Sequence, residues 1–134
     1  MPTTTWGNGN STKEFINFQG EEIDLEGRSE YKKLVIRNCP NVNYIALDNC
    51  GLEGLIIEDC PKLKHLQGYH NKLTELKLGS FPELQRIYIP FNRLEMLEIS
   101  GCPKLDNLYC NNKRVIICVV FGLQHTWNVF VESS

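Results

Sequence analysis

Few side chains in this sequence have the type and spacing that catalysis or metal binding requires. His65 and His70 are five residues apart and have no third ligand at a suitable spacing, so we expect surface histidines rather than a metal site. Glu21 and Glu22 are adjacent, which in a strand places their carboxylates on opposite faces. No phosphate-binding, serine-hydrolase or zinc-protease motif occurs. We therefore predict that the chain is not an enzyme and uses no cofactor or metal.

The six cysteines could form disulfides or remain as buried thiols, and their positions help to decide. Cys39, Cys60 and Cys102 recur at one position of a repeat, where a further copy has Phe81. A position that also accepts phenylalanine belongs to an apolar core, where free cysteine behaves as a small hydrophobic residue. Cys39 and Cys60 belong to successive copies of this repeat, which would stack on each other as adjacent turns of the chain. The two residues would then be close enough to form a disulfide, so their redox state stays open. We favour reduced thiols, which are typical of a reducing compartment.

The elements that position these residues belong to a repeat of 21 residues. Its first segment reads VNYIALDNCGL, LKHLQGYHNKL, LQRIYIPFNRL and LDNLYCNNKRV. Its second segment reads YKKLVIRNCPN, LEGLIIEDCPK, LTELKLGSFPE and LEMLEISGCPK. The alternation of apolar and other residues predicts two short strands per coil, on opposite sides of a flattened tube. Each proline is expected where a strand stops, because it has no N–H to donate.

These patterns, LxxLxLxxNxL with cysteine as a variant of the asparagine and LxxLxIxxCPx, resemble those of the leucine-rich-repeat family. The resemblance covers roughly residues 31–121 and is closest to the short-repeat arrays of bacteria and some fungi. It implies a solenoid of about five coils, mostly parallel β-strand, with little or no helix and irregular terminal caps. We expect the side chains of Asn71 and Asn92 to hydrogen-bond the backbone of the bend that follows the first strand.

The chain is expected to be one domain, because a repeat array grows by adding coils. Residues 31–114 are the regular repeats. Residues 1–30 are interpreted as a leader followed by a degenerate first coil, in which Ile23 precedes Ile45 by 22 residues instead of 21. Residues 115–134 are predicted to be a C-terminal cap. An apolar patch for self-association, or the cut end of a longer array, are the alternatives.

Outward-facing residues of the first segment form a grid in which four of the five tyrosines fall. Tyr88 and Tyr109 occupy the same position of adjacent coils, so their rings should stack. The grid should also expose Ala46, Asp48 and Pro90. Tyrosine favours strands in any case, but tyrosine and arginine also dominate interface hot spots. We predict a partner-binding site consisting of Tyr44, His65, Gln67, Tyr69, Arg86, Tyr88, Asn107 and Tyr109.

The resemblance implies non-catalytic recognition of a protein partner through this grid. A structural or spacer segment of a longer array is an alternative hypothesis, and carbohydrate binding by a secreted form is another. The opposite face carries charges of both signs, such as Arg37 and Glu58 in one row, and is interpreted as structural.

The overall charge and the apolar runs bear on partners and location. A net charge of −2 gives no electrostatic reason to expect a nucleic acid or an anionic membrane as a partner. The longest apolar run, from Val115 to Phe121, is far shorter than the roughly 20 residues that span a bilayer. The N-terminus lacks the basic start and apolar core of a secretory signal. We therefore predict a cytoplasmic protein.

Overall fold

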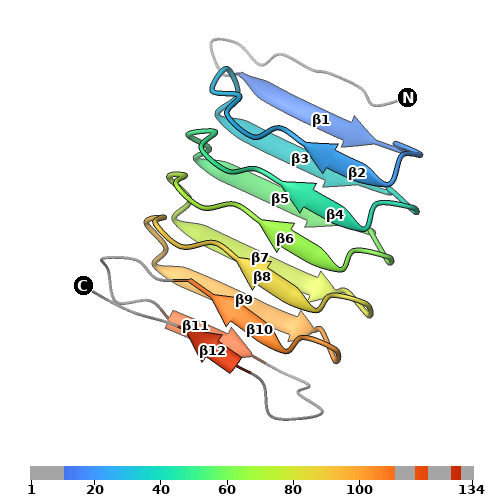
Figure 1. The fold of residues 1–134 in the computed structure, drawn as a ribbon, viewed down its shortest axis with the longest axis vertical. Coiled ribbons are helices and arrows are strands. Elements are labelled where there is room, and N and C mark those ends of the chain that lie inside the picture. The colour runs from blue at the N-terminus through green and yellow to red at the C-terminus, as the bar shows by residue number, and fades with distance from the viewer. Residues whose placement is uncertain (1–10, 111–116, 121–127, 131–134) are drawn as a thin grey trace.

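Strands alternate between two layers along the chain, and each coil contributes one strand to each layer (Figure 1). The computed structural model describes residues 11–110, 117–120 and 128–130. Over these residues the chain forms a parallel β-solenoid of about five turns without a helix, which confirms the predicted architecture. The described residues accordingly include no helix that is long and apolar enough to cross a membrane.

The front layer is one continuous sheet, and the back layer is two sheets of three strands each. The front strands are β2 (Glu22–Asp24), β4 (Tyr44–Ala46), β6 (His65–Gln67), β8 (Arg86–Tyr88), β10 (Asn107–Tyr109) and β12 (Asn128–Phe130). The back strands are β1 (Thr12–Ile16), β3 (Lys33–Arg37), β5 (Gly54–Glu58), β7 (Glu75–Ser80), β9 (Met96–Gly101) and β11 (Ile117–Val120).

Neighbouring strands pair in parallel with a constant offset, so equivalent residues of successive coils lie directly above one another. Ile45 pairs with Leu66, and Leu34 pairs with Leu55, in both cases 21 positions later. Ile23 pairs with Ile45 at an offset of 22, which confirms the predicted slip in the first coil. The 21-residue period of the sequence therefore corresponds to one full turn of the solenoid, which places equivalent residues directly above one another.

The apolar positions of both repeat segments fill the space between the two layers. Burying one leucine or isoleucine side chain contributes about 1.5–3 kcal/mol, and a single coil cannot enclose its own. The core residues that are at most 1% exposed include Leu34, Ile45, Leu66, Leu76, Ile87, Leu97 and Leu108. Contacts between adjacent coils therefore supply most of the stabilisation.

A tight turn after each of the back strands β3, β5, β7 and β9 brings the chain round to the front layer. In each turn the residue before the proline accepts a hydrogen bond of 3.2–3.4 Å from the N–H three residues later. Proline at the second position suits such a turn, because its fixed φ is the one required there. The N–H groups that close these turns belong to Val42, Leu63, Leu84 and Leu105.

Buried asparagine side chains hold the opposite corner of the coil, as predicted. Asn71 is only 6% exposed. Its Oδ1 accepts hydrogen bonds from the N–H groups of Cys50 and Leu52 at 3.2 and 2.9 Å, and its Nδ2 donates to the Leu47 carbonyl at 2.8 Å. Asn92 is equally buried and makes corresponding bonds one coil further along. Each amide thus satisfies backbone groups of the preceding coil.

The cysteines behave as core residues wherever the structure describes their side chains. Burial raises the pKa of the Cys60 thiol to about 11. In the coil before that of Asn71, Cys50 occupies the equivalent position. Its thiol donates a hydrogen bond to the Leu25 carbonyl at 2.8 Å, as the Asn71 amide donates to the Leu47 carbonyl. The thiols that are buried and not in a disulfide are those of Cys39, Cys50, Cys60, Cys102 and Cys110. The expectation of buried thiols is confirmed for these five, whereas the Cys118 side chain lies outside the described residues.

Both layers continue past the regular repeats. In β11, Cys118 pairs with Leu97, and in β12, Val129 pairs with Leu108, each at the offset of 21. The rest of the predicted cap in residues 115–134, including the apolar patch considered for self-association, lies outside the described residues. So do residues 1–10 of the predicted leader.

The back layer is interrupted between β5 and β7, which are neighbours in space but belong to different sheets. Two hollows of about 430 and 250 Å³ follow this line, which we call the seam. The chain turns differently on its two sides. Asn38 and Asp59 end β3 and β5 with φ values of 53° and 55°, whereas β7 stays extended through Ser80 and pairs there with Gly101.

The seam lies next to a coil in which the cysteine position holds a larger residue, as it also does in the first coil, where Phe18 is equivalent to Cys39. Phe81 occupies the position of Cys60 and Cys102 and is 2% exposed. Ring size alone does not set the path of the chain, because Phe18 follows Asn17 with a φ of 59°, whereas Cys102 follows the extended strand β9. Gly101 permits β9 to follow closely, because a Cβ there would lie 3.0 Å from the Gly79 carbonyl oxygen. The two kinds of corner differ instead in the residue before the cysteine position, which is Asn38 or Asp59 on one side of the seam and Ser80 or Gly101 on the other.

Replacing Asn92 with leucine should lower the free energy of unfolding by about 1–3 kcal/mol, because buried backbone groups would lose their partners. Urea denaturation of the whole chain measures this difference. The matched control is Asn107→Leu, since the Asn107 amide donates only to the exposed Asp106 carboxylate. Equal losses in the two variants would contradict the role given to Asn92.

Backbone amides that face the seam should exchange with solvent faster than those inside the paired sheets. Amides of β5 and β7 that point toward each other have no ladder partner, whereas those between β7 and β9 are paired. Hydrogen exchange followed by NMR distinguishes the two sets, since alternate residues of a strand point to opposite neighbours. Equal protection on both sides of β7 would show that the back layer is continuous in solution.

Candidate functional site

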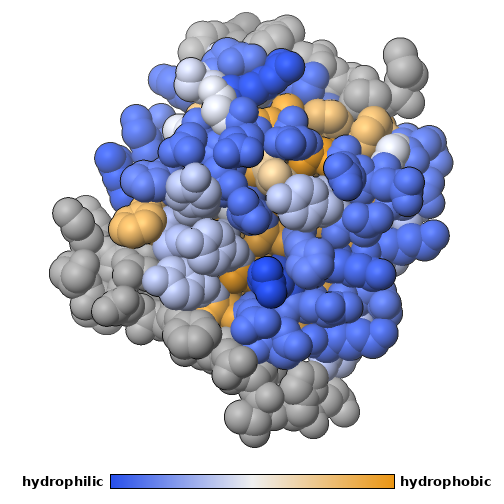
Figure 2. Space-filling model, viewed as in Figure 1, coloured by the Kyte–Doolittle hydropathy of each residue, from blue (hydrophilic) through white to orange (hydrophobic). Residues whose placement is uncertain are grey.

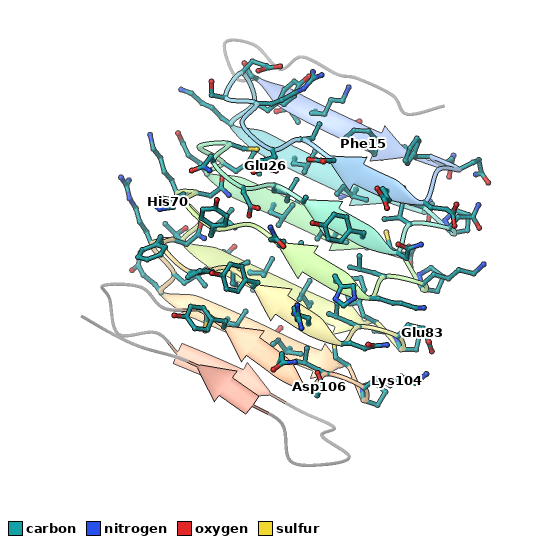
Figure 3. All side chains as sticks on the ribbon, in the orientation of Figure 1. Phe15, Glu26, His70, Glu83, Lys104 and Asp106 are labelled. Carbon is teal, nitrogen blue, oxygen red and sulfur yellow. The ribbon has the colours of Figure 1, made fainter. Side chains whose placement is uncertain are left out.

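The predicted site residues lie on the outer face of the front sheet, which its short strands make narrow. We call the outward-facing side chains of β2, β4, β6, β8 and β10 the front strip (Figure 3). One row along it runs Glu22, Tyr44, His65, Arg86 and Asn107, and the next row runs Asp24, Ala46, Gln67, Tyr88 and Tyr109. Their positions follow from the alternation of each strand and from the constant offset between coils.

Three tyrosines form a continuous row of rings at one side of the strip. The centroids of Tyr88 and Tyr109 lie 5.2 Å apart with an angle of 31° between the rings, so the two rings are in contact as predicted but are tilted rather than stacked. Tyr69 meets Tyr88 edge to face at 6.2 Å. In Figure 2, side chains of intermediate hydropathy gather on this side of the face. Such contacts fix the rings in place before any partner arrives.

Tyr44 lies apart from these three rings. It is on β4, two strands away from Tyr88, and its surroundings are acidic rather than aromatic. Burial raises the pKa of its phenol first, and the carboxylates of Asp48, Asp24, Glu26 and Glu22 raise it further. The structure therefore divides the predicted site into an acidic end around β2 and β4 and an aromatic part over β6, β8 and β10.

A hollow of about 400 Å³ opens on the aromatic part of the strip, within the size range of small-ligand pockets. Its lining combines one guanidinium, two primary amides and two phenols. Arg86 is exposed and forms no ion pair with any other described residue. The lining residues are Gln67, Arg86, Ile87, Tyr88, Asn107 and Tyr109. Five of the eight predicted site residues thus meet in one place.

His65 lies beside Arg86 and is neutral over a wider pH range than a free histidine. Burial lowers the pKa of its imidazole, the charges of Arg86 and Lys64 lower it further, and Asp106 opposes them. The unfolded chain then binds the proton more tightly than the folded one. This histidine therefore reduces stability as the pH falls below about 6.5.

Three positions expected to be exposed are buried, and the prediction was wrong for them. Asp48 is 1% exposed, because its carboxylate accepts hydrogen bonds from the Gln67 side chain and, at 2.9 Å, from the Tyr69 N–H. Ala46 is short and lies between longer side chains of its row, and Pro90 follows the end of β8, where the chain turns inward. Asp48 does not meet a partner; it holds Gln67 and Tyr69 in place.

Sequence reasoning missed two aromatic residues at the edge of the strip. The rings of His70 and Phe91 stack at 4.8 Å, and His70, which Figure 3 labels, also contacts Tyr69 edge to face at 5.3 Å. Both have positive φ, at 58° and 57°, in a row with Asn49. Phe91 is 53% exposed although phenylalanine rarely adopts this conformation. A signal was present in the sequence, since the equivalent position elsewhere holds asparagine, a residue that tolerates positive φ.

Replacing Arg86 with methionine should raise the pKa of His65, because the change removes a neighbouring cation and keeps most of the side-chain volume. The pKa should stay below its usual value, since burial remains the largest influence. An NMR titration of the imidazole measures the shift. Arg93→Met provides the control at an exposed arginine in the turn after β8. An unchanged pKa in the Arg86 variant would contradict the described geometry.

The front strip combines charged, polar and aromatic side chains. Among residues 11–110, no group of three or more His, Cys, Asp or Glu side chains is placed to hold a metal ion. The strip offers ring edges, amides, a guanidinium and carboxylates on a rigid sheet. No family model, curated protein or solved structure matches the chain. Evidence on function therefore comes from the strip itself.

Proposed function

We propose that the chain is a leucine-rich-repeat protein that recognises a protein partner through the front strip and catalyses no reaction. The LxxLxLxxNxL and LxxLxIxxCPx patterns support the family assignment, together with the stacked parallel coils. The five free, buried thiols among the described residues support the predicted cytoplasmic location, because such thiols are typical of reducing compartments.

The observation that carries the proposal is the row of three tyrosine rings beside the exposed Arg86. Tyr88 contacts both Tyr69 and Tyr109, so these rings are already ordered in the free protein. Binding a partner therefore costs less side-chain conformational entropy than it would on a flexible surface. Tyr88 is 36% exposed and lies between the other two rings. Aromatic and arginine side chains held on a rigid sheet are the usual anchors of protein interfaces.

The ring arrangement favours a protein partner over a carbohydrate. A sugar stacks on the open face of an aromatic ring, whereas here neighbouring rings cover part of each other's faces. The strip therefore presents ring edges and hydroxyl groups, which suit the mixed apolar and polar contacts of a polypeptide.

Substituting alanine at Arg86, Tyr88 and Tyr109 together should abolish capture of a protein partner from a lysate of the source cells. The three side chains are partly or fully exposed, so the variant should remain folded, which circular dichroism checks. The measurement is a pull-down with wild type and variant, followed by identification of the proteins that only the wild type retains.

The matched control carries alanine at three positions of the back layer, Glu75, Lys77 and Glu98. These charged side chains lie on β7 and β9, away from the strip. It should capture the same partner as the wild type. If all three proteins capture the same set, or if none captures anything, the strip is not a recognition surface. The chain is then better described as a structural segment.

A further inference from the structure

The front strip has a shape that restricts what can lie on it. Each of its strands has three residues, about 10 Å, and the five strands from β2 to β10 span about 19 Å at the usual spacing of 4.8 Å. The resulting area is about 190 Å², far below the roughly 800 Å² per partner of a stable protein dimer. One extended segment of polypeptide, laid across the strands, covers such a strip.

The strip is also polarised in charge along its length. Glu22, Asp24 and Glu26 are exposed at the β2 end, and all three act on Tyr44 of the next strand. Further along, the exposed Lys64, just before β6, and the exposed Arg86, on β8, both act on His65. Figure 3 shows Glu26 toward one end of the face and Asp106, the acidic residue that partly offsets the cations, toward the other.

The distance between the two charged ends corresponds to a definite spacing in a bound peptide. Three strand spacings, from β2 to β8, amount to about 14 Å. An extended chain rises about 3.3 Å per residue, so about four residues cover that distance. Residues four apart in an extended chain point to the same side, and both can face the strip.

From these observations we infer that the front strip binds an extended peptide segment that carries a basic residue and an acidic residue four positions apart. The basic side chain lies on the carboxylates of Glu22 and Asp24, and the acidic side chain lies on Arg86. Tyr88 and Tyr109 contact the apolar part of the peptide beyond the acidic residue. The inference rests on the proposed function, to which it adds the class of ligand and its charge pattern.

The test is selection of random nine-residue peptides, displayed on phage, against the immobilised full-length chain. Enriched peptides should carry opposite charges four positions apart, in either order along the peptide. In fluorescence anisotropy, Arg86→Glu should weaken binding of an enriched peptide about fivefold or more, as expected for loss and reversal of an exposed ion pair. The same peptide with its acidic residue changed to lysine should prefer the Arg86→Glu protein.

Control variants distinguish the possible outcomes. Arg93→Glu reverses an exposed arginine in the turn after the same strand and should leave binding unchanged. If enriched peptides bind through Tyr88 and Tyr109, as alanine substitution shows, but have no charge preference, the inference fails and the proposed function stands. If neither alanine substitution nor charge reversal alters binding, both fail. Absence of any enriched peptide overturns the inference and leaves the pull-down to decide the function.

A second copy of the chain is the competing occupant, since an acidic and a basic end could pair across a two-fold axis. Analytical ultracentrifugation of the wild type and of Arg86→Glu tests it. A monomeric wild type agrees with the inference. A dimer that Arg86→Glu dissociates would show that the strip pairs with itself, and the inference would be overturned.

Discussion

The register between successive coils depends on the hydrogen bonds of a buried side-chain amide, that of Asn71. At the corners after β4 and β6 the chain turns so tightly that backbone groups face the core and find their partners in the next coil. The amide of Asn71 supplies partners for Leu47, Cys50 and Leu52 of the preceding coil. Because leaving such groups unpaired costs about 1–3 kcal/mol each, a coil is stable only with its successor in the correct register. The vertical stacking of the molecule follows from this requirement.

Exact stacking, in turn, determines which side chains meet on the surface. Residues separated by one repeat become neighbours about 4.8 Å apart, whatever their types. Tyr88 contacts Tyr109 for this reason alone, and the polarity of charge from Glu22 to Arg86 is a property of successive repeats read in order. Asp48 adds a second bond between coils by accepting the Tyr69 N–H. The front strip is therefore preorganised by the same register that closes the core.

The sequence was sufficient to predict the coils, the register, the slip at Ile23 and the contact between Tyr88 and Tyr109, because each depends only on period and alternation. It was insufficient where a position leaves the regular pattern. Asp48 follows an outward alternation but lies beyond the end of β4, where the chain curls inward and hydrogen bonds decide burial. The stacking of His70 on Phe91 depends on positive φ values at a turn, which hydrophobic periodicity does not report.

The seam behind β6 has a mechanical consequence. A solenoid with a continuous front sheet and an interrupted back layer has its lowest bending stiffness at the interruption, with the front sheet acting as the leaf of a hinge. Opening or closing the back by a small amount changes the curvature of the front between β4 and β8. The affinity of a ligand that contacts several of those strands would therefore depend on the free energy of bending the solenoid at the seam.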